Sequence, residues 1–169
     1  MKNIKLKNHS FILDACCGGK MFWFNKSHPN VIFQDQRIVE TIVVGSGKNA
    51  RNFECNPDIV ADFRNMPYPD NSFSLVVFDP PHFTSLGKNS YMAKKYGVLN
   101  KETWKEDIKN GFSECFRVLK DTGILVFKWN EYDIKLSEVL KLAPCRPLFG
   151  HPSGKSQQTH WVCFMKLKE

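Results

Sequence analysis

The chain has 169 residues, of which 42% are hydrophobic and 24% charged, and it carries a net charge of +7. These values fit one globular domain with a real core and exclude an intrinsically disordered chain. No apolar run approaches the roughly 20 residues that cross a bilayer, so we expect no membrane-spanning segment. Residues 1–19 also lack the apolar stretch of a signal peptide, and we therefore expect a cytoplasmic protein.

Short β-like runs alternate with helical segments along the chain. The predicted strands are residues 10–16, 30–35, 58–63, 74–79 and 123–130. Residues 101–120 form the clearest helix, because their apolar side chains recur every three or four positions. A second helix is predicted over residues 133–143, just before Pro144. At the end of the chain, "RPLFGHP" and "THWVCFMKL" predict two antiparallel strands.

Nearly continuous apolar strands that alternate with helices indicate a mostly parallel sheet. We therefore predict an α/β fold with a Rossmann-like sheet, three layers (α/β/α) and an antiparallel C-terminal hairpin at the edge of the sheet. No linker and no repeat divides the chain. Residues 1–169 are expected to form a single domain.

Six cysteines are spread along the chain, at positions 16, 17, 55, 115, 145 and 163. None forms a C-x-x-C pair, and structural metal sites need thiolates at short spacing. We predict no metal site and expect reduced thiols that mostly pack as small apolar side chains.

Four successive predicted strands end in a carboxylate: Asp14, Asp35, Asp62 and Asp79. In open α/β sheets, ligands bind at the carboxyl ends of the strands. A buried charge is costly unless it meets a ligand or a partner, so four such acids indicate a ligand site. "DACCGG" is not G-x-G-x-x-G, and "GSGKNA" at residues 45–50 matches a phosphate loop only in part. Acids around a glycine turn suit a ligand with hydroxyls, an amino group and positive charge.

From Phe11 to Met165, the sequence resembles the class I S-adenosylmethionine-dependent methyltransferases. "ILDACCGGKMF" is similar to the first motif of this family, and "FQDQR" is similar to the second. "ADFRNMP" is similar to the segment that carries the adenine-binding acid. The resemblance implies S-adenosylmethionine as the cofactor, with Asp35 on the ribose hydroxyls, Asp62 near the adenine amine and Phe63 against the adenine ring. It implies further cofactor contacts from Asp14, Cys16, Gly18 and Gly19.

"DPPH", residues 79–82, resembles the [DNS]-P-P-[YFWH] motif of the branch that methylates planar amino nitrogens, chiefly the exocyclic amines of bases. The resemblance implies that the Asp79 carboxylate and the Pro80 carbonyl accept the two hydrogens of the amino group. The lone pair of that nitrogen then points at the methyl group. Pro80 and Pro81 restrict the backbone, so the carbonyl is held before the substrate arrives. His82 takes the aromatic position that stacks on the base, a role that Phe83 could share.

Residues 84–101 follow this motif and contain four lysines and two interleaved tyrosines but no acid. Such a segment can pair with phosphates and stack on bases, although a solvated loop has the same composition. The expected substrate-binding residues are Lys88, Tyr91, Lys94, Lys95 and, at the end of the fifth predicted strand, Lys128.

The expected function is methylation of an exocyclic amino group of a nucleic-acid base, with adenine N6 favoured over cytosine. The chain is too short for a separate target-recognition domain, so specificity is relaxed, the target is RNA, or a partner provides recognition. We otherwise expect a monomer. Two alternatives stay open: methylation of a glutamine or other protein amide, and a non-catalytic nucleic-acid-binding domain with a degenerate cofactor pocket.

Overall fold

The computed structural model describes residues 10–44, 47–87 and 90–167. Its strands are β1 (Ile12–Asp14), β2 (Val31–Asp35), β3 (Val39–Val44), β4 (Arg51–Cys55), β5 (Ile59–Val60), β6 (Phe73–Phe78), β7 (Leu119–Asn130), β8 (Phe149–Ser153) and β9 (Thr159–Met165). Its helices are α1 (Tyr91–Tyr96), α2 (Trp104–Val118) and α3 (Leu136–Val139), with 3₁₀ turns η1 (Gly47–Asn49) and η2 (Leu140–Leu142). Within these residues, none of the helices has the length and apolarity of a membrane span.

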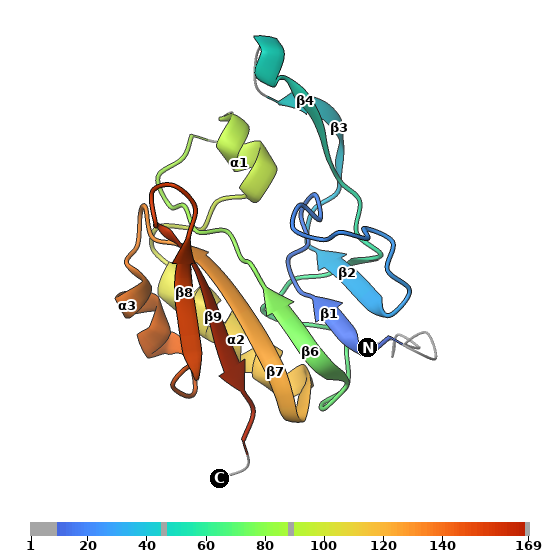
Figure 1. Cartoon of the computed structure of the whole chain (residues 1–169), viewed down its shortest axis with the longest axis vertical. Coiled ribbons are helices and arrows are strands. Elements are labelled where there is room, and N and C mark those ends of the chain that lie inside the picture. Colours follow the sequence, from blue (N-terminus) through green and yellow to red (C-terminus); the bar gives the residue numbers. More distant parts are fainter. Residues whose placement is uncertain (1–9, 45–46, 88–89, 168–169) are drawn as a thin grey trace.

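Seven strands form one sheet in the order β5-β2-β1-β6-β7-β9-β8 (Figure 1). The pairings from β5 to β7 are parallel, whereas β9 runs antiparallel to both β7 and β8. The prediction of a Rossmann-like, mostly parallel α/β sheet with a C-terminal hairpin is confirmed. One detail differs: β8 runs in the direction of β7, so the antiparallel strand lies inside the sheet and not at its edge.

Helix α2 covers one face of the sheet because its apolar stripe faces the strands (Figure 1). The rings of Phe112 and Phe127 lie 4.9 Å apart between their centroids, and those of Phe112 and Phe78 lie 5.6 Å apart. Burying one such ring stabilises the fold by roughly 1.5–3 kcal/mol. Gly111 permits this close approach, because a Cβ there would lie 2.5 Å from Cζ of Phe78.

The opposite face is covered differently from the expected third layer. Among the described residues, no helix follows β1 or β2: residues 15–30 are turns and coil, and the β3–β4 hairpin precedes β5. Aromatic side chains of that coil pack on the sheet instead. The ring of Trp23 lies edge-on to Phe33 at 5.2 Å, and that of Phe22 lies edge-on to Trp161 at 5.3 Å.

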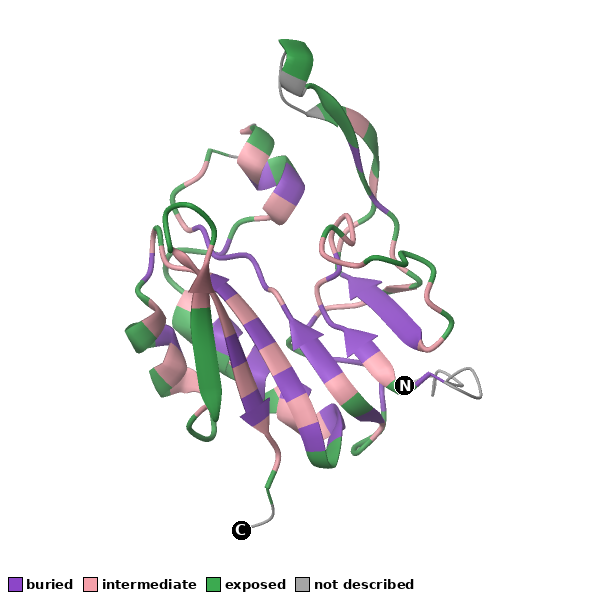
Figure 2. Cartoon of the chain, in the orientation of Figure 1, coloured by how far each residue is buried: buried purple, intermediate pink, exposed green. Residues whose placement is uncertain are grey.

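The β3–β4 hairpin, which the sequence did not predict, projects beyond the carboxyl ends of the parallel strands (Figure 1). The two strands pair antiparallel, with Ile42 opposite Phe53. Most of the hairpin is exposed, but Phe53 and Cys55 at its base are buried (Figure 2). Of the partial phosphate loop at residues 45–50, residues 45–46 lie outside the described part of the chain, and residues 47–49 form η1 just before β4.

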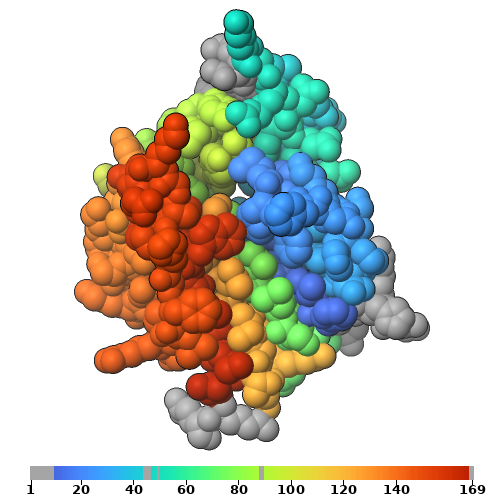
Figure 3. All heavy atoms as spheres, viewed as in Figure 1, coloured from blue at the N-terminus to red at the C-terminus, as the bar shows by residue number. Residues whose placement is uncertain are grey.

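Residues 84–101 also differ from the expected loop, because they contain the short helix α1. The Ser90 side chain accepts a hydrogen bond from the backbone N–H of Ala93 and so caps its start. Gly97, with φ of +78°, ends it. Helix α1 stands beside the base of the hairpin, at the same end of the sheet (Figure 3).

Candidate functional site

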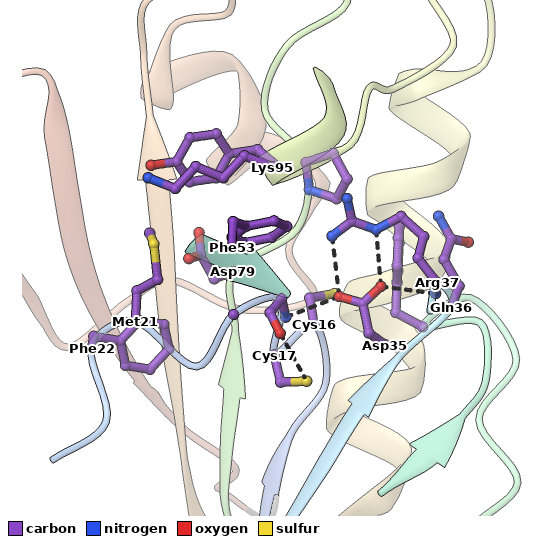
Figure 4. Close-up of a pocket in the computed structure, with 15 residues that line it drawn as sticks. Cys16, Cys17, Met21, Phe22, Asp35, Gln36, Arg37, Phe53, Asp79 and Lys95 are labelled. Atoms are coloured by element: carbon purple, nitrogen blue, oxygen red, sulfur yellow. Dashed lines mark hydrogen bonds and ion pairs between the residues drawn. The ribbon is translucent and has the colours of Figure 1, made fainter. Parts of the chain in front are cut away.

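A pocket of about 530 Å³, including its open mouth, lies where β1, β2 and β6 end (Figure 4). This is the edge of the sheet at which α/β proteins of this topology bind ligands. The predicted site residues that line it are Cys16, Gly18, Gly19, Asp35, Phe63, Asp79, Pro81 and Lys95. Lining residues that the sequence analysis did not single out are Cys17, Met21, Phe22, Gln36, Arg37, Phe53 and Tyr96.

The glycine turn after β1 forms one wall of the pocket. Gly18 has φ of +47°, a backbone conformation that glycine adopts without strain. A Cβ on Gly19 would lie 2.8 Å from Cε2 of Phe53 and 3.2 Å from the Glu54 carbonyl oxygen. The two glycines therefore have different roles, one in turning the chain and one in letting the hairpin base pack on the turn.

The carboxylate of Asp35 ends β2 and is buried at the pocket wall. Its Oδ1 accepts hydrogen bonds from N and Nε of Arg37 at 2.9 and 3.0 Å. Its Oδ2 accepts from the Gly18 N–H at 3.0 Å and from Nη2 of Arg37 at 3.3 Å. These four bonds fill the acceptor positions of a carboxylate. A ribose can therefore bind Asp35 only if the Arg37 guanidinium moves away.

Asp14 is fully buried and does not line the pocket. It accepts hydrogen bonds from Nε1 of Trp23 at 2.7 Å and from the Cys16 N–H at 3.3 Å. Burial raises the pKa of Asp14 to about 7, although the Trp23 bond opposes this shift. The carboxyl is therefore partly protonated near neutral pH.

Asp79 directly follows β6, and its two carboxylate oxygens have different surroundings. Its Oδ2 accepts a hydrogen bond from Nζ of Lys128 at 2.6 Å. Its Oδ1 is buried and has no hydrogen-bond partner among the described residues. An unpaired buried acceptor costs about 1–3 kcal/mol, so a ligand that donates a hydrogen to Oδ1 is favoured.

Lys128, an expected substrate-binding residue, forms an ion pair with Asp79, and strand pairing explains this position. A contact between Lys128 and the substrate stays a prediction. Phe78 of β6 is paired with Phe127 of β7, so the next residue on each strand is also a neighbour of the other. The Lys128 ammonium further lies 5.6 Å from the centroid of the Phe22 ring and 5.7 Å from that of Trp161. These rings and the carboxylate hold it in place.

His82 and Phe83 are buried beside the pocket and do not line it. The His82 ring lies 4.6 Å from Phe83, 5.7 Å from Tyr96 and 6.0 Å from Trp129, between ring centroids. Burial lowers the pKa of His82, so its ring is neutral at pH 7, and its Nδ1 has no partner among the described residues. Tyr96, which touches His82, is the aromatic side chain that reaches the pocket here.

The neighbouring Pro80 and Pro81 are also buried, but only Pro81 lines the pocket. Two successive prolines restrict the backbone between Asp79 and His82. The roles of Pro80 as a hydrogen-bond acceptor and of His82 and Phe83 in stacking stay predictions.

Helix α1 brings one of the predicted lysines to the pocket. Lys95 is only 9% exposed, and its Nζ lies 4.8 Å from the ring centroid of Tyr96. It forms no ion pair within the part of the chain that the structure describes. Lys94 and Tyr91 are exposed outside the pocket, and Lys88 lies outside the described residues.

Asp62 lies apart from the pocket lining, although Phe63 is part of it. Both Asp62 oxygens accept hydrogen bonds from Arg64, the shortest at 2.6 Å, and Arg64 also binds Asp107 at 2.8 Å. The Arg64 bonds lower the pKa of Asp62. An adenine contact by Asp62 stays a prediction that requires this ion pair to rearrange.

Cys17, Asp35 and Cys55 bring their ligand atoms within 4.8 Å of one another, a cluster that the sequence spacing did not indicate. Two facts oppose a metal ion in it. The Arg37 guanidinium already supplies a positive charge to Asp35, and a hydrogen bond with Cys55, together with burial, raises the pKa of the Cys17 thiol. Metal ligation needs the thiolate.

The sequence matches no protein-family model and no curated protein. Among solved structures, the chain is similar to the PH0226 protein from Pyrococcus horikoshii OT3. The alignment covers 93% of this chain and 81% of that one, with a TM-score of 0.55 and 14% identity. It shows a shared fold. The antibiotic-resistance methyltransferase Kmr aligns over 92% of this chain and 86% of its own, with a TM-score of 0.46 and 11% identity, and a likeness this distant carries no functional argument.

Proposed function

We propose that the protein is an S-adenosylmethionine-dependent methyltransferase that acts on an exocyclic amino group of a nucleic-acid base, with adenine N6 favoured. One observation carries this proposal. The buried Oδ1 of Asp79 lacks a hydrogen-bond donor among the described residues, and Asp79 lines the same pocket as the Gly18–Gly19 turn and Asp35. The unpaired Oδ1 of Asp79 therefore adjoins a pocket that suits a ligand with hydroxyl groups.

The residues present fit the proposed cofactor. Gly18 and Gly19 keep the turn free of side chains, and Phe63 offers a ring at the pocket wall. Asp35 can accept the ribose hydroxyls once Arg37 has moved. When bound, the cofactor supplies a methyl group on a sulfonium.

On the substrate side, the chain has to position an unreactive nitrogen. The lone pair of an exocyclic amine is delocalised into the ring, so the nitrogen is a poor nucleophile. Asp79 Oδ1 accepts one amino hydrogen, while Lys128 holds the other carboxylate oxygen in place. The Pro80 carbonyl is the proposed second acceptor, which draws the nitrogen toward tetrahedral geometry. Positioning of this kind provides roughly 7–11 kcal/mol in favourable cases.

A base inside a duplex cannot reach such a pocket, so the target is flipped out or lies in a single strand. Tyr96 supplies an aromatic face at the pocket wall, and base–aromatic stacking is worth about 1–3 kcal/mol. No strong base is needed for this step, because the proton leaves the nitrogen after the new bond has formed.

Asp79→Ala tests the proposal. We expect S-adenosylmethionine affinity to stay within about threefold of wild type while methyl transfer falls at least about 100-fold, because the glycine turn and Asp35 are unchanged and the acceptor for the reacting group is lost. Calorimetry measures the first quantity. Mass spectrometry of nucleosides from DNA and RNA incubated with the protein measures the second. Glu138→Ala, a change at an exposed acid of α3, is the matched control and should alter neither.

Three results would contradict the proposal. If Asp79→Ala loses cofactor binding and methyl transfer equally, Asp79 is not the acceptor for the substrate amino group. Methylated glutamine in a protein fraction, with unmodified nucleosides, would support the amide alternative. Absence of cofactor binding by the wild-type protein would leave only a non-catalytic domain.

A further inference from the structure

A second depression adjoins the pocket and opens toward the β3–β4 hairpin. This groove encloses about 1430 Å³, including its open mouth. It shares Gly18, Gly19, Met21, Phe53 and Lys95 with the pocket, so the two are continuous. Its walls come from the coil after β1, from the hairpin and from α1, which meet at the carboxyl end of the sheet (Figures 1 and 3).

The lining of the groove is strongly basic. Four cations line it, Lys20, Lys26, Arg51 and Lys95, against one acid, Glu54, which accepts a hydrogen bond from Thr41 at 3.2 Å. Lys26 and Arg51 are exposed, and neither forms an ion pair with another described residue. Free cations along both walls of a groove attract a polyanion.

Lys95 provides a second, independent indication, because it lies where the groove meets the pocket. Its side chain is nine-tenths buried, yet no carboxylate of the described chain pairs with it. A buried ammonium without a counter-charge is costly, so this position favours an anionic group from a ligand. A phosphate next to a base held in the pocket has that charge.

The hairpin packs against the pocket at its base, and its described residues above the base are mostly exposed. Phe53 packs against Gly19, so closely that a Cβ on Gly19 would lie 2.8 Å from the ring. Beyond this contact, Thr41, Val43, Arg51 and Asn52 are exposed (Figure 2). An arm that is anchored beside the pocket and carries its free cation outward is suited to hold a long ligand.

We propose that the β3–β4 hairpin is a substrate-binding arm and that the groove beneath it holds the phosphate backbone of the strand that carries the target base. Lys95 binds the phosphate next to that base, and Lys26 and Arg51 bind phosphates farther along the strand. This inference rests on the proposed function, and it assigns backbone binding to a segment other than residues 84–101 alone.

The test compares two double variants that lose the same charge. Lys26→Ala with Arg51→Ala changes the groove, and Lys109→Ala with Lys141→Ala changes exposed lysines of α2 and η2. Each protein is titrated into labelled single-stranded oligonucleotides, one of DNA and one of RNA, while anisotropy is followed between about 50 and 200 mM salt. Calorimetry with S-adenosylmethionine checks that each variant retains its cofactor pocket.

We expect the groove variant to lose about 1.4 from the slope of log affinity against log salt, at about 0.7 for each phosphate contact. The ratio of wild-type affinity to variant affinity should therefore fall about sevenfold over that fourfold rise in salt. The control variant should keep the wild-type slope. The oligonucleotide that shows the larger effect identifies DNA or RNA as the better ligand.

If the wild-type protein binds oligonucleotides with the same salt slope as the groove variant, the role of the hairpin as a substrate-binding arm is overturned, and the proposed function still stands. An equal loss in both double variants would also overturn it, because the effect would then come from net charge. If the wild-type protein binds cofactor but no oligonucleotide, the nucleic-acid substrate itself is wrong and the arm fails with it.

Discussion

Asp14, Asp62 and Asp79 lie at or just after the ends of parallel strands, and they behave differently because their surroundings differ. Asp14 has two hydrogen-bond donors but is fully buried, and burial dominates. Asp62 is partly exposed and paired with Arg64, which favours its charged form. Asp79 has one oxygen on Lys128 and the other unpaired. At similar places after strands, Asp14 is therefore a carboxyl that is partly protonated near neutral pH, Asp62 belongs to an ion pair, and Asp79 has an acceptor oxygen without a partner among the described residues.

The raised pKa of Asp14 makes stability depend on pH. In the unfolded chain the carboxyl has its ordinary pKa of 3.8, whereas in the fold its pKa is about 7. The folded state therefore binds more protons between these values, and this contribution to stability is lost as pH rises. For a single group we expect a loss of about 2 kcal/mol between about pH 5 and 7.

Urea unfolding of wild type and Asp14→Asn across this pH range measures the effect. The difference between the two proteins isolates Asp14, since His82 and the other titrating groups are common to both. The free energy of unfolding should fall with pH more steeply in wild type than in the variant. A difference that stays constant across the range would show that Asp14 ionises normally in the fold.

At the scale of elements, α2 packs closely on the sheet at Gly111. Gly111 faces Phe78 of β6 and Phe63, and both rings are buried. A methyl group added there meets two aromatic side chains with no free space to move into. The helix can approach β6 this closely only because residue 111 lacks a side chain.

We expect Gly111→Ala to lower the free energy of unfolding by about 1–2 kcal/mol. Overpacking costs about 1–3 kcal/mol, and the better helix propensity of alanine returns up to about 1 kcal/mol. Ser113→Ala, at an exposed position of the same helix, is the control for propensity and should be neutral or slightly stabilising. Thermal or urea unfolding measures the stability of both variants. A Gly111→Ala variant more stable than wild type would show that the helix can shift away from the sheet.

Most elements that bury apolar side chains could be predicted from the sequence, whereas the β3–β4 hairpin and α1 could not. The strands of the sheet and α2 have periodic apolar residues, because one face or both faces of each lie in the core. The β3–β4 hairpin has little such signal, since most of its side chains are exposed. Helix α1 is a single short segment between polar residues, and its lysines indicated only a loop.

The candidate site divides in the same way. Asp35 and Asp79 could be placed because they follow strands whose order is recognisable. Lys128 could have been placed on Asp79 from the pairing of β6 with β7. Phe53 could not be placed, because it reaches the pocket from a hairpin that the apolar pattern does not reveal.

At the scale of the whole molecule, the chain consists of a packed sheet and an arm that shares little of its core. The largest buried cluster includes side chains of β1, β6, β7, β9 and α2, whereas Phe53 and Cys55 of the arm belong to a small separate cluster. Few buried contacts and an exposed backbone are the properties of a segment that opens without global unfolding.

Hydrogen exchange should therefore separate the two parts. We expect amides of β3 and β4 above the base to exchange at least about tenfold faster than those of β6 and β7, because they open locally. The β8–β9 hairpin, which is paired into the sheet through β9, is the internal comparison and should be more protected than the arm. Equal protection in the arm and the central strands would mean that the arm opens only with the whole fold.

The guanidinium of Arg37 is a built-in competitor for any diol that approaches Asp35. A ligand with two hydroxyls must evict it, so the measured affinity is weaker than the intrinsic one by the free energy of that internal pair. The displaced guanidinium stays nearby, because its Nη1 donates a hydrogen bond to the Lys94 carbonyl at 3.4 Å. If the proposed function holds, binding of the ribose at Asp35 frees this positive charge beside the pocket, and we then expect the cofactor to bind before the nucleic acid.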